Sequence, residues 1–221
     1  MDQLAILDSA TVPTRPAFWS LDAWAICRPK RAFQFIAAQP AGGGLWLAIR
    51  RPLFVTFVLG CGISLLTTGV LTLRVLLSVT TYWTFVPAIE AVALVAVVRR
   101  RPGGATWAAT IDRFFVGHGT WTLFLILLVG SLAFTPPHVG WRLILTTWLP
   151  MLGVVIGWSA YVDFCFFRWI SGASSGGAVA RVLVHRVLVW ITVFIIFAVP
   201  DASPAAFAAE LREIFEELAR P

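Results

Sequence analysis

Four ionisable residues lie within or beside long apolar stretches of this sequence: Glu90, His118, Asp163 and His185. Ionisable side chains are costly in a bilayer, and they often mark ion or proton pathways. A carboxylate–histidine chain could relay protons, two histidines and two carboxylates could bind a metal, and a polar cluster could line a solute path. The sequence favours a fourth, structural interpretation, in which these residues pair with each other, with Arg168 or with backbone carbonyls and hold helices together.

Helix geometry predicts that these four side chains can meet. Each lies a few residues from a basic residue that marks one end of its apolar stretch, respectively Arg99, Arg113, Arg168 and Arg181. At about 1.5 Å per residue, His118, Asp163 and His185 lie at a similar depth and Glu90 somewhat deeper. We therefore expect one polar cluster in which Glu90 or Asp163 pairs with a histidine. No HxxxH or ExxH spacing occurs on one predicted helix, so we expect no metal and no other cofactor.

The composition indicates a membrane protein. Of 221 residues, 59% are apolar and 13% are charged, whereas a soluble domain carries about 25% charged residues. The net charge of +6 comes from arginines at the ends of apolar runs, which is typical of membrane topology signals rather than of nucleic-acid binding. There is no GxSxG, HExxH or glycine-rich nucleotide motif, so we expect no enzymatic activity. An intramembrane histidine–carboxylate enzyme is the weakest alternative.

Three consecutive arginines, Arg99, Arg100 and Arg101, separate two of the apolar stretches. An arginine costs roughly 2.5–3.5 kcal/mol at the bilayer centre, so this run predicts a surface loop, and the positive-inside rule makes the loop cytoplasmic. Counting from it gives five spans with the N-terminus in the cytoplasm and the C-terminus outside. Their predicted ranges are about 53–77, 82–98, 114–134, 141–167 and 182–199.

The predicted fold is an all-α polytopic transmembrane helix bundle with amphipathic surface helices at both ends. Residues 1–51 form a cytoplasmic interfacial segment, or alternatively a soluble cap on the bundle. Residues 52–200 form the five-helix transmembrane domain, and residues 201–221 form an acidic amphipathic helix on the outer side. We expect anionic lipid headgroups to contact the basic residues Arg28, Lys30, Arg31, Arg50, Arg51, Arg99, Arg100 and Arg101.

Small residues and prolines predict local features of the spans. Gly60, Gly62 and Ser64 form a surface for close helix packing, and a GxxxG spacing at 153–157 is a second candidate face. A proline at 52 is expected to start the first span. Prolines at 87 and 150 are expected to kink or bend the second and fourth spans.

A segment ahead of the spans resembles the Yip1-domain family of membrane proteins. It reads Ile26-Cys27-Arg28-Pro29-Lys30-Arg31-Ala32-Phe33 and is followed by Pro40. The layout of five spans after a cytoplasmic N-terminus is also similar to that family. The Asp-Leu-Tyr-Gly-Pro and Gly-Tyr motifs of eukaryotic members, which bind small GTPases in vesicle trafficking, are missing here. The resemblance implies a bacterial inner-membrane protein and transfers no catalytic residue.

These observations predict a non-enzymatic protein of a bacterial inner membrane. Its expected role is to organise or assist a membrane-protein complex, or membrane trafficking or assembly, with anionic lipid and either a membrane-protein partner or a second copy as its contacts. No nucleic acid is expected among them. The alternative is a small proton-coupled transporter or channel component that uses Glu90 with the histidine and aspartate residues of the cluster.

Overall fold

The computed structural model describes residues 20–40, 44–98 and 105–198, and all regular structure within them is helical. Five helical segments are long and apolar enough to cross a membrane: Leu45–Thr68, Leu73–Val97, Trp107–Ala133, Ile144–Trp169 and Ser175–Ile196. At 1.5 Å per residue each exceeds a hydrocarbon core of about 30 Å. The predicted five-span, all-helical membrane fold is therefore confirmed. The arginine run at 99–101 and the acidic segment 201–221 lie outside the described residues.

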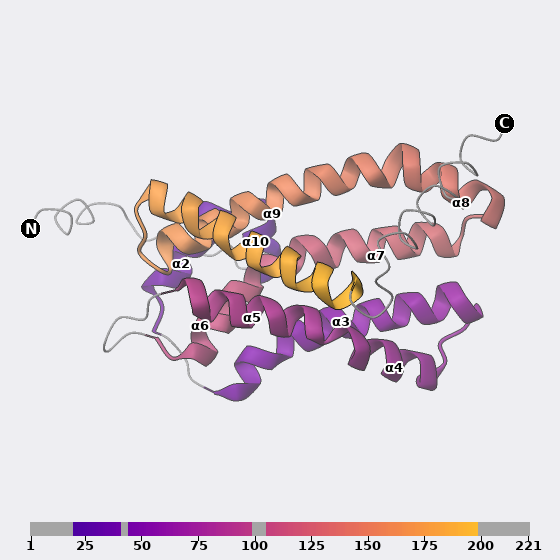
Figure 1. Ribbon diagram of the computed structural model, residues 1–221, viewed down its shortest axis with the longest axis horizontal. Helices are drawn as coiled ribbons and strands as arrows, with labels where there is room; N and C mark the ends of the chain where they lie inside the picture. The colour runs from indigo at the N-terminus through magenta and orange to yellow at the C-terminus, as the bar shows by residue number, and fades with distance from the viewer. Residues whose placement is uncertain (1–19, 41–43, 99–104, 199–221) are drawn as a thin grey trace, which may run out of the picture.

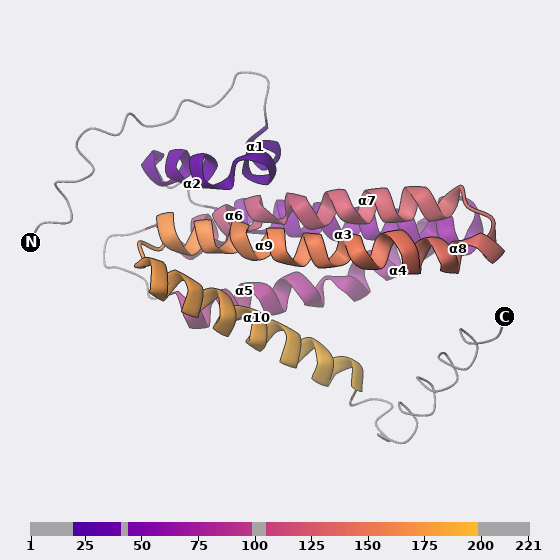
Figure 2. The same ribbon diagram turned by 90° about the horizontal axis from the view of Figure 1, so that it is seen from above.

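The spans run side by side along the long axis of the molecule (Figure 1). In chain order the elements are α1 (Leu21–Cys27), α2 (Pro29–Ala38), α3 (Leu45–Thr68), α4 (Leu73–Trp83), α5 (Phe85–Val97), α6 (Trp107–Phe115), the 3₁₀ turn η2 (Val116–His118), α7 (Gly119–Ala133), α8 (Pro137–Leu143), the π-helical η3 (Ile144–Trp148), α9 (Leu149–Trp169) and α10 (Ser175–Ala198). Helix α3 packs against α4, α6 and α7, whereas α10 packs against α5 and α9. Figure 2 shows α1 and α2 on one side of the bundle and α10 on the other.

The short helices α1 and α2 pack on the bundle through their aromatic residues. The Ser20 side chain caps α1, and Pro29 opens α2 as its first residue. Trp24 and Phe33 are buried in the main core, where α2 lies against α9. The burial of Trp24 and Phe33 agrees with the alternative of a cap on the bundle. Contact of the exposed basic residues with lipid headgroups stays a prediction.

The first span differs from its predicted range at both ends. Helix α3 begins at Leu45 and ends at Thr68, so Pro52 lies inside it rather than at its start. The helix continues through the basic pair before Pro52 because Arg50 and Arg51 form ion pairs within the protein, which lowers the cost of burying them. The predicted ranges 53–77 and 82–98 also imply a turn at 78–81, which is wrong because residues 73–83 form helix α4. The chain turns at Gly69, whose φ of +71° ends the helix in the left-handed conformation that favours glycine.

Two predicted proline effects coincide with observed interruptions. Helices α4 and α5 are separated at Thr84, three residues before Pro87, which has no N–H for the carbonyl one turn earlier. The π-helical turn η3 lies directly ahead of Pro150. The third and fifth spans begin earlier than predicted, at Trp107 and Ser175, because their first turns extend past the most apolar stretch.

Of the two small-residue surfaces, only the first packs within the described chain. A Cβ added at Gly60 would lie 2.9 Å from the Leu76 carbonyl oxygen, and one added at Gly62 would lie 2.7 Å from a Val129 methyl group. These glycines let α3 approach α4 and α7 closely, as predicted. Nothing lies within 4 Å of such an atom at Gly153 or Gly157. The GxxxG face therefore packs against no described part of this chain.

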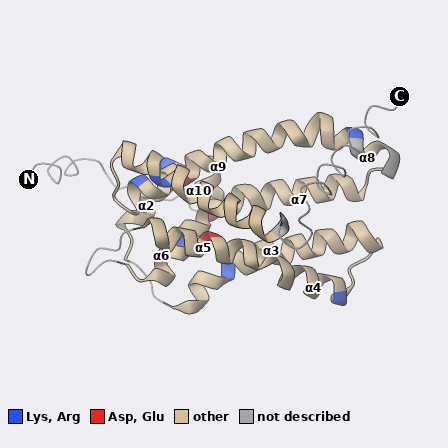
Figure 3. Cartoon of the chain, in the orientation of Figure 1, with Lys and Arg blue, Asp and Glu red and all other residues tan. Residues whose placement is uncertain are grey.

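Basic residues gather at one end of the bundle (Figure 3). This end carries α2, the start of α6 and the connection between α9 and α10 (Figure 1). At the other end, Arg74 lies in the first turn of α4 and Arg142 in α8. The asymmetry agrees with the charge pattern from which the orientation was predicted, and the orientation itself stays a prediction.

Candidate functional site

The structure brings the four predicted cluster residues to one cavity between the spans. Glu90 comes from α5, His118 from η2, Asp163 from α9 and His185 from α10, and all four line the cavity. The Nε2 atom of His118 lies 2.9 Å from a carboxylate oxygen of Glu90. The Nε2 atom of His185 lies 3.2 Å from the backbone oxygen of Glu90. Because a carbonyl oxygen only accepts, this contact requires His185 to donate from Nε2.

A helix interruption places His118 against α5. The three-residue 3₁₀ turn η2 separates α6 from α7, and glycines flank the histidine on both sides. A Cβ at Gly117 would lie 2.7 Å from a Val162 methyl group, and one at Gly119 would lie 2.8 Å from Ile26. The glycines thus allow α9 and α1 to pack directly on this turn. A 3₁₀ stretch within a long helix often marks a functional hinge or a sequence under strain.

Arg186 is a cluster member that the analysis of the sequence did not single out. Its guanidinium donates to the Asp163 carboxylate at 2.8 and 3.1 Å, to the Ser159 hydroxyl at 2.8 Å and to the Ile156 carbonyl at 3.2 Å. A signal was present, since an arginine inside a predicted span requires a partner. The predicted pairing with Arg168 is wrong, because that side chain donates instead to the Ala173 carbonyl at 2.8 Å.

The charges of the cluster do not balance when both histidines are neutral. Glu90 and Asp163 contribute two negative charges and Arg186 contributes one positive charge. One further proton makes the cluster neutral, and the contact between His118 and Glu90 is the place where it can be held. The Nδ1 atoms of His118 and His185 are buried without a hydrogen-bond partner among the described residues. The arrangement can therefore hold and release a proton inside the bundle.

The cavity has a volume of about 330 Å³ and combines a polar region with an apolar one. On α10, the polar residues His185 and Arg186 precede the apolar lining residues Val189 and Trp190. On α5, Glu90 likewise lies nearer the basic end of the bundle than the apolar lining residues Val86 and Pro87. A pocket of this size with few polar groups at one end suits a small organic ligand.

A second group of ion pairs ties α1, α3 and α6 together. Arg51 donates to Asp22 at 2.8 Å and also pairs with Asp112, which in turn accepts from Arg50 at 3.2 Å. Arg51 and Asp112 are mostly buried, with side chains 15% and 16% exposed. Arg51 thus binds carboxylates of the protein itself and is mostly buried, whereas Arg28, Lys30, Arg31 and Arg50 are exposed, as contact with lipid headgroups would require.

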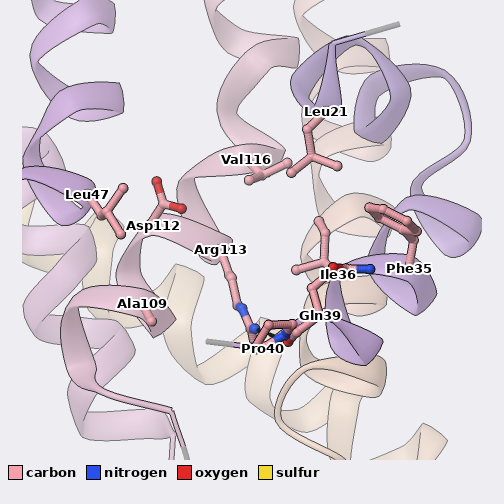
Figure 4. A pocket seen from close by; sticks show the side chains of 10 residues that line it. All are labelled: Leu21, Phe35, Ile36, Gln39, Pro40, Leu47, Ala109, Asp112, Arg113 and Val116. Carbon is pink, nitrogen blue, oxygen red and sulfur yellow. Dashed lines mark hydrogen bonds between the residues drawn. The ribbon is translucent and has the colours of Figure 1, made fainter. Parts of the chain in front are cut away.

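A smaller pocket of about 160 Å³ lies beside this second group (Figure 4). Asp112 lies near Leu47 on one side of it, and Arg113 reaches across to Gln39 and Pro40 at the end of α2. The Arg113 guanidinium donates to the Gln39 carbonyl at 2.8 Å. These contacts fix α2 to α6, so we assign this region to holding the N-terminal helices in place.

Within the described ranges, no three His, Cys, Asp or Glu side chains are grouped so that they could hold a metal ion. No family model, curated protein or solved structure matches the chain. The function is therefore inferred from the geometry of the cavity and its ionisable residues.

Proposed function

We propose that the protein moves a small solute across the membrane in exchange for protons, and that Glu90 and His118 hold the proton. The observation that supports this is the position of the Glu90–His118 contact on the wall of a 330 Å³ cavity. Residues that only held helices together would need no open volume beside them. Buried ionisable residues facing a cavity within the membrane are typical of solute and proton pathways.

The two ion pairs of the cluster differ in a way that supports separate roles. The carboxylate of Asp163 has a permanently charged partner in Arg186, which is also held by Ser159. The partner of Glu90 is His118, whose imidazole is charged only when both ring nitrogens carry protons. The Glu90–His118 pair thus suits proton exchange, whereas the Asp163–Arg186 pair suits positioning of α9 against α10.

The role predicted from the sequence, organising a membrane complex, is the second candidate. Its support is the GxxxG face at Gly153 and Gly157, which packs against no described part of this chain and has the spacing found where transmembrane helices pack closely. A variant at Glu90 separates the two candidates, because Glu90 lines the cavity and the GxxxG face lies on another helix.

The test uses proteoliposomes with an imposed pH gradient and a trapped pH indicator. Solutes that share a phenyl ring but differ in charge are added in turn: benzyltrimethylammonium, benzyl alcohol and benzenesulfonate. We expect at least one to change the decay of the gradient with the wild-type protein. The effect should be lost with Glu90→Gln, which removes the charge at nearly constant shape, and partly retained with Glu90→Asp.

The controls are protein-free vesicles and the size-exclusion profile of each variant. If none of the solutes acts through the wild-type protein, the transport proposal is wrong. If Glu90→Gln folds normally and leaves the decay of the gradient as in the wild-type protein with every solute, the organising role takes its place.

We also propose that the basic end of the bundle faces the cytoplasm of a bacterial inner membrane. The positive-inside rule and the resemblance of residues 26–33 to the Yip1-domain family support this orientation. A reporter active only outside the cytoplasm, fused after Pro221, should be active. If the reporter is active only when it is fused at the N-terminus, the orientation is the reverse of the one proposed.

A further inference from the structure

We infer that the solute of the central cavity is a small monovalent organic cation with apolar substituents; the inference rests on the transport function proposed above. Two independent features of the cavity point to this class. One is the net charge of its polar region, and the other is the kind of side chain that forms its apolar wall.

The polar region favours a cation over an anion. Its carboxylates, Glu90 and Asp163, outnumber its one permanent cation, Arg186. The guanidinium of Arg186 is already engaged by Asp163, Ser159 and the Ile156 carbonyl, so it offers little to an incoming anion. After His118 gives up its extra proton, the cluster carries one net negative charge, which a monovalent cation balances. In a site of low dielectric constant, a cluster whose net charge is zero is strongly favoured over a charged one.

The wall beside this region is aromatic. Three indoles line the cavity, those of Trp83, Trp121 and Trp190, together with the rings of Phe114 and Phe115. Aromatic faces attract cations through their ring quadrupole, most strongly for tryptophan, and they suit quaternary ammonium groups in particular. The same rings exclude water and favour apolar substituents on the cation.

Exchange follows from the two features together. Before the cation enters, the extra proton resides on the His118 imidazole, opposite the Glu90 carboxylate. When the cation enters, His118 releases this proton to water and becomes neutral, and the charge of Glu90 is balanced by the cation instead. The other ionisable groups that face this pair are Asp163, His185 and Arg186, and none of them changes its charge. The stoichiometry is therefore one proton released for each cation bound.

The test measures binding and proton release for purified protein in lipid nanodiscs. Benzyltrimethylammonium should bind and acidify a weakly buffered solution by about one proton per bound cation. Benzyl alcohol and benzenesulfonate should bind at least about tenfold more weakly, and Glu90→Gln should weaken cation binding by a similar factor. Trp121→Leu should weaken cation binding several-fold and Trp121→Phe should weaken it less. Trp46→Leu, outside the cavity, should leave binding unchanged.

The outcomes separate this inference from the transport function. Equal binding of the three solutes by the wild-type protein would overturn the inference, and so would binding of the cation without proton release. It is also wrong if neither benzyltrimethylammonium nor the larger tetraphenylphosphonium binds. If benzenesulfonate or benzyl alcohol alone discharges the pH gradient in proteoliposomes, the transport proposal stands and only the cation class falls.

Discussion

Replacing Arg186 with methionine should destabilise the protein by about 3–5 kcal/mol, the usual cost of leaving one partner of a buried ion pair alone. The Arg186 and Asp163 side chains are 19% and 13% exposed, and the guanidinium makes bonds to α9 at three residues. Methionine preserves much of the apolar stem but none of these bonds. The carboxylate of Asp163 would remain in the bundle without its permanent countercharge. Unfolding in mixed detergent micelles, followed by circular dichroism, gives the free energy directly.

A double variant provides the matched control for this prediction. Arg186→Met combined with Asp163→Leu removes both charges, and replacing a buried ion pair by apolar residues is often neutral or stabilising. We therefore expect the double variant to recover most of the stability lost in the single one. A single variant as stable as the wild type would show that the pair contributes little to holding α9 against α10.

Arg51→Met should also destabilise the protein, by about 2–4 kcal/mol. Arg51 lies between Asp22 of α1 and Asp112 of α6, and it belongs to α3. Its loss leaves Asp22 without its ion-pair partner, leaves Asp112 paired only with the more exposed Arg50, and releases α1 from the first span. The expected value is below that for Arg186 because Asp22 is 41% exposed, and solvent screens part of its charge. Protease susceptibility of residues 20–40 and the free energy of unfolding should change together.

The neighbouring arginine supplies a close control. Arg50 is 41% exposed and contacts only one of the two carboxylates, Asp112, at 3.2 Å. Exposed ion pairs contribute about 0–1 kcal/mol, so Arg50→Met should leave stability nearly unchanged. Equal effects of the two substitutions would mean that charge near the membrane surface, rather than the geometry of Arg51, stabilises this end of the bundle.

The number of spans could be predicted from sequence because it depends on the summed hydropathy of each long segment. About twenty consecutive apolar residues favour the bilayer whatever their neighbours do. Span limits depend on single residues, and here the prediction failed. Pro52 was interpreted as a helix start but lies inside helix α3. Gly69, a residue type that often ends helices, was not interpreted as the end of this one. Helix α3 begins before Pro52 because its arginines form ion pairs, and it ends at Thr68 because Gly69 adopts the left-handed backbone conformation.

The sequence by itself predicted that His118, Asp163 and His185 lie at similar depth and Glu90 somewhat deeper, because the rise per residue sets the depth along a helix. It left open which of them would touch. Only the tertiary structure decided that Glu90 faces His118 and that Asp163 faces Arg186. Those pairings depend on the rotation of each helix about its axis, which packing determines. Close contacts at Gly117 and Gly119 position the turn that carries His118. Such contacts join residues far apart in the chain, and no local pattern records them.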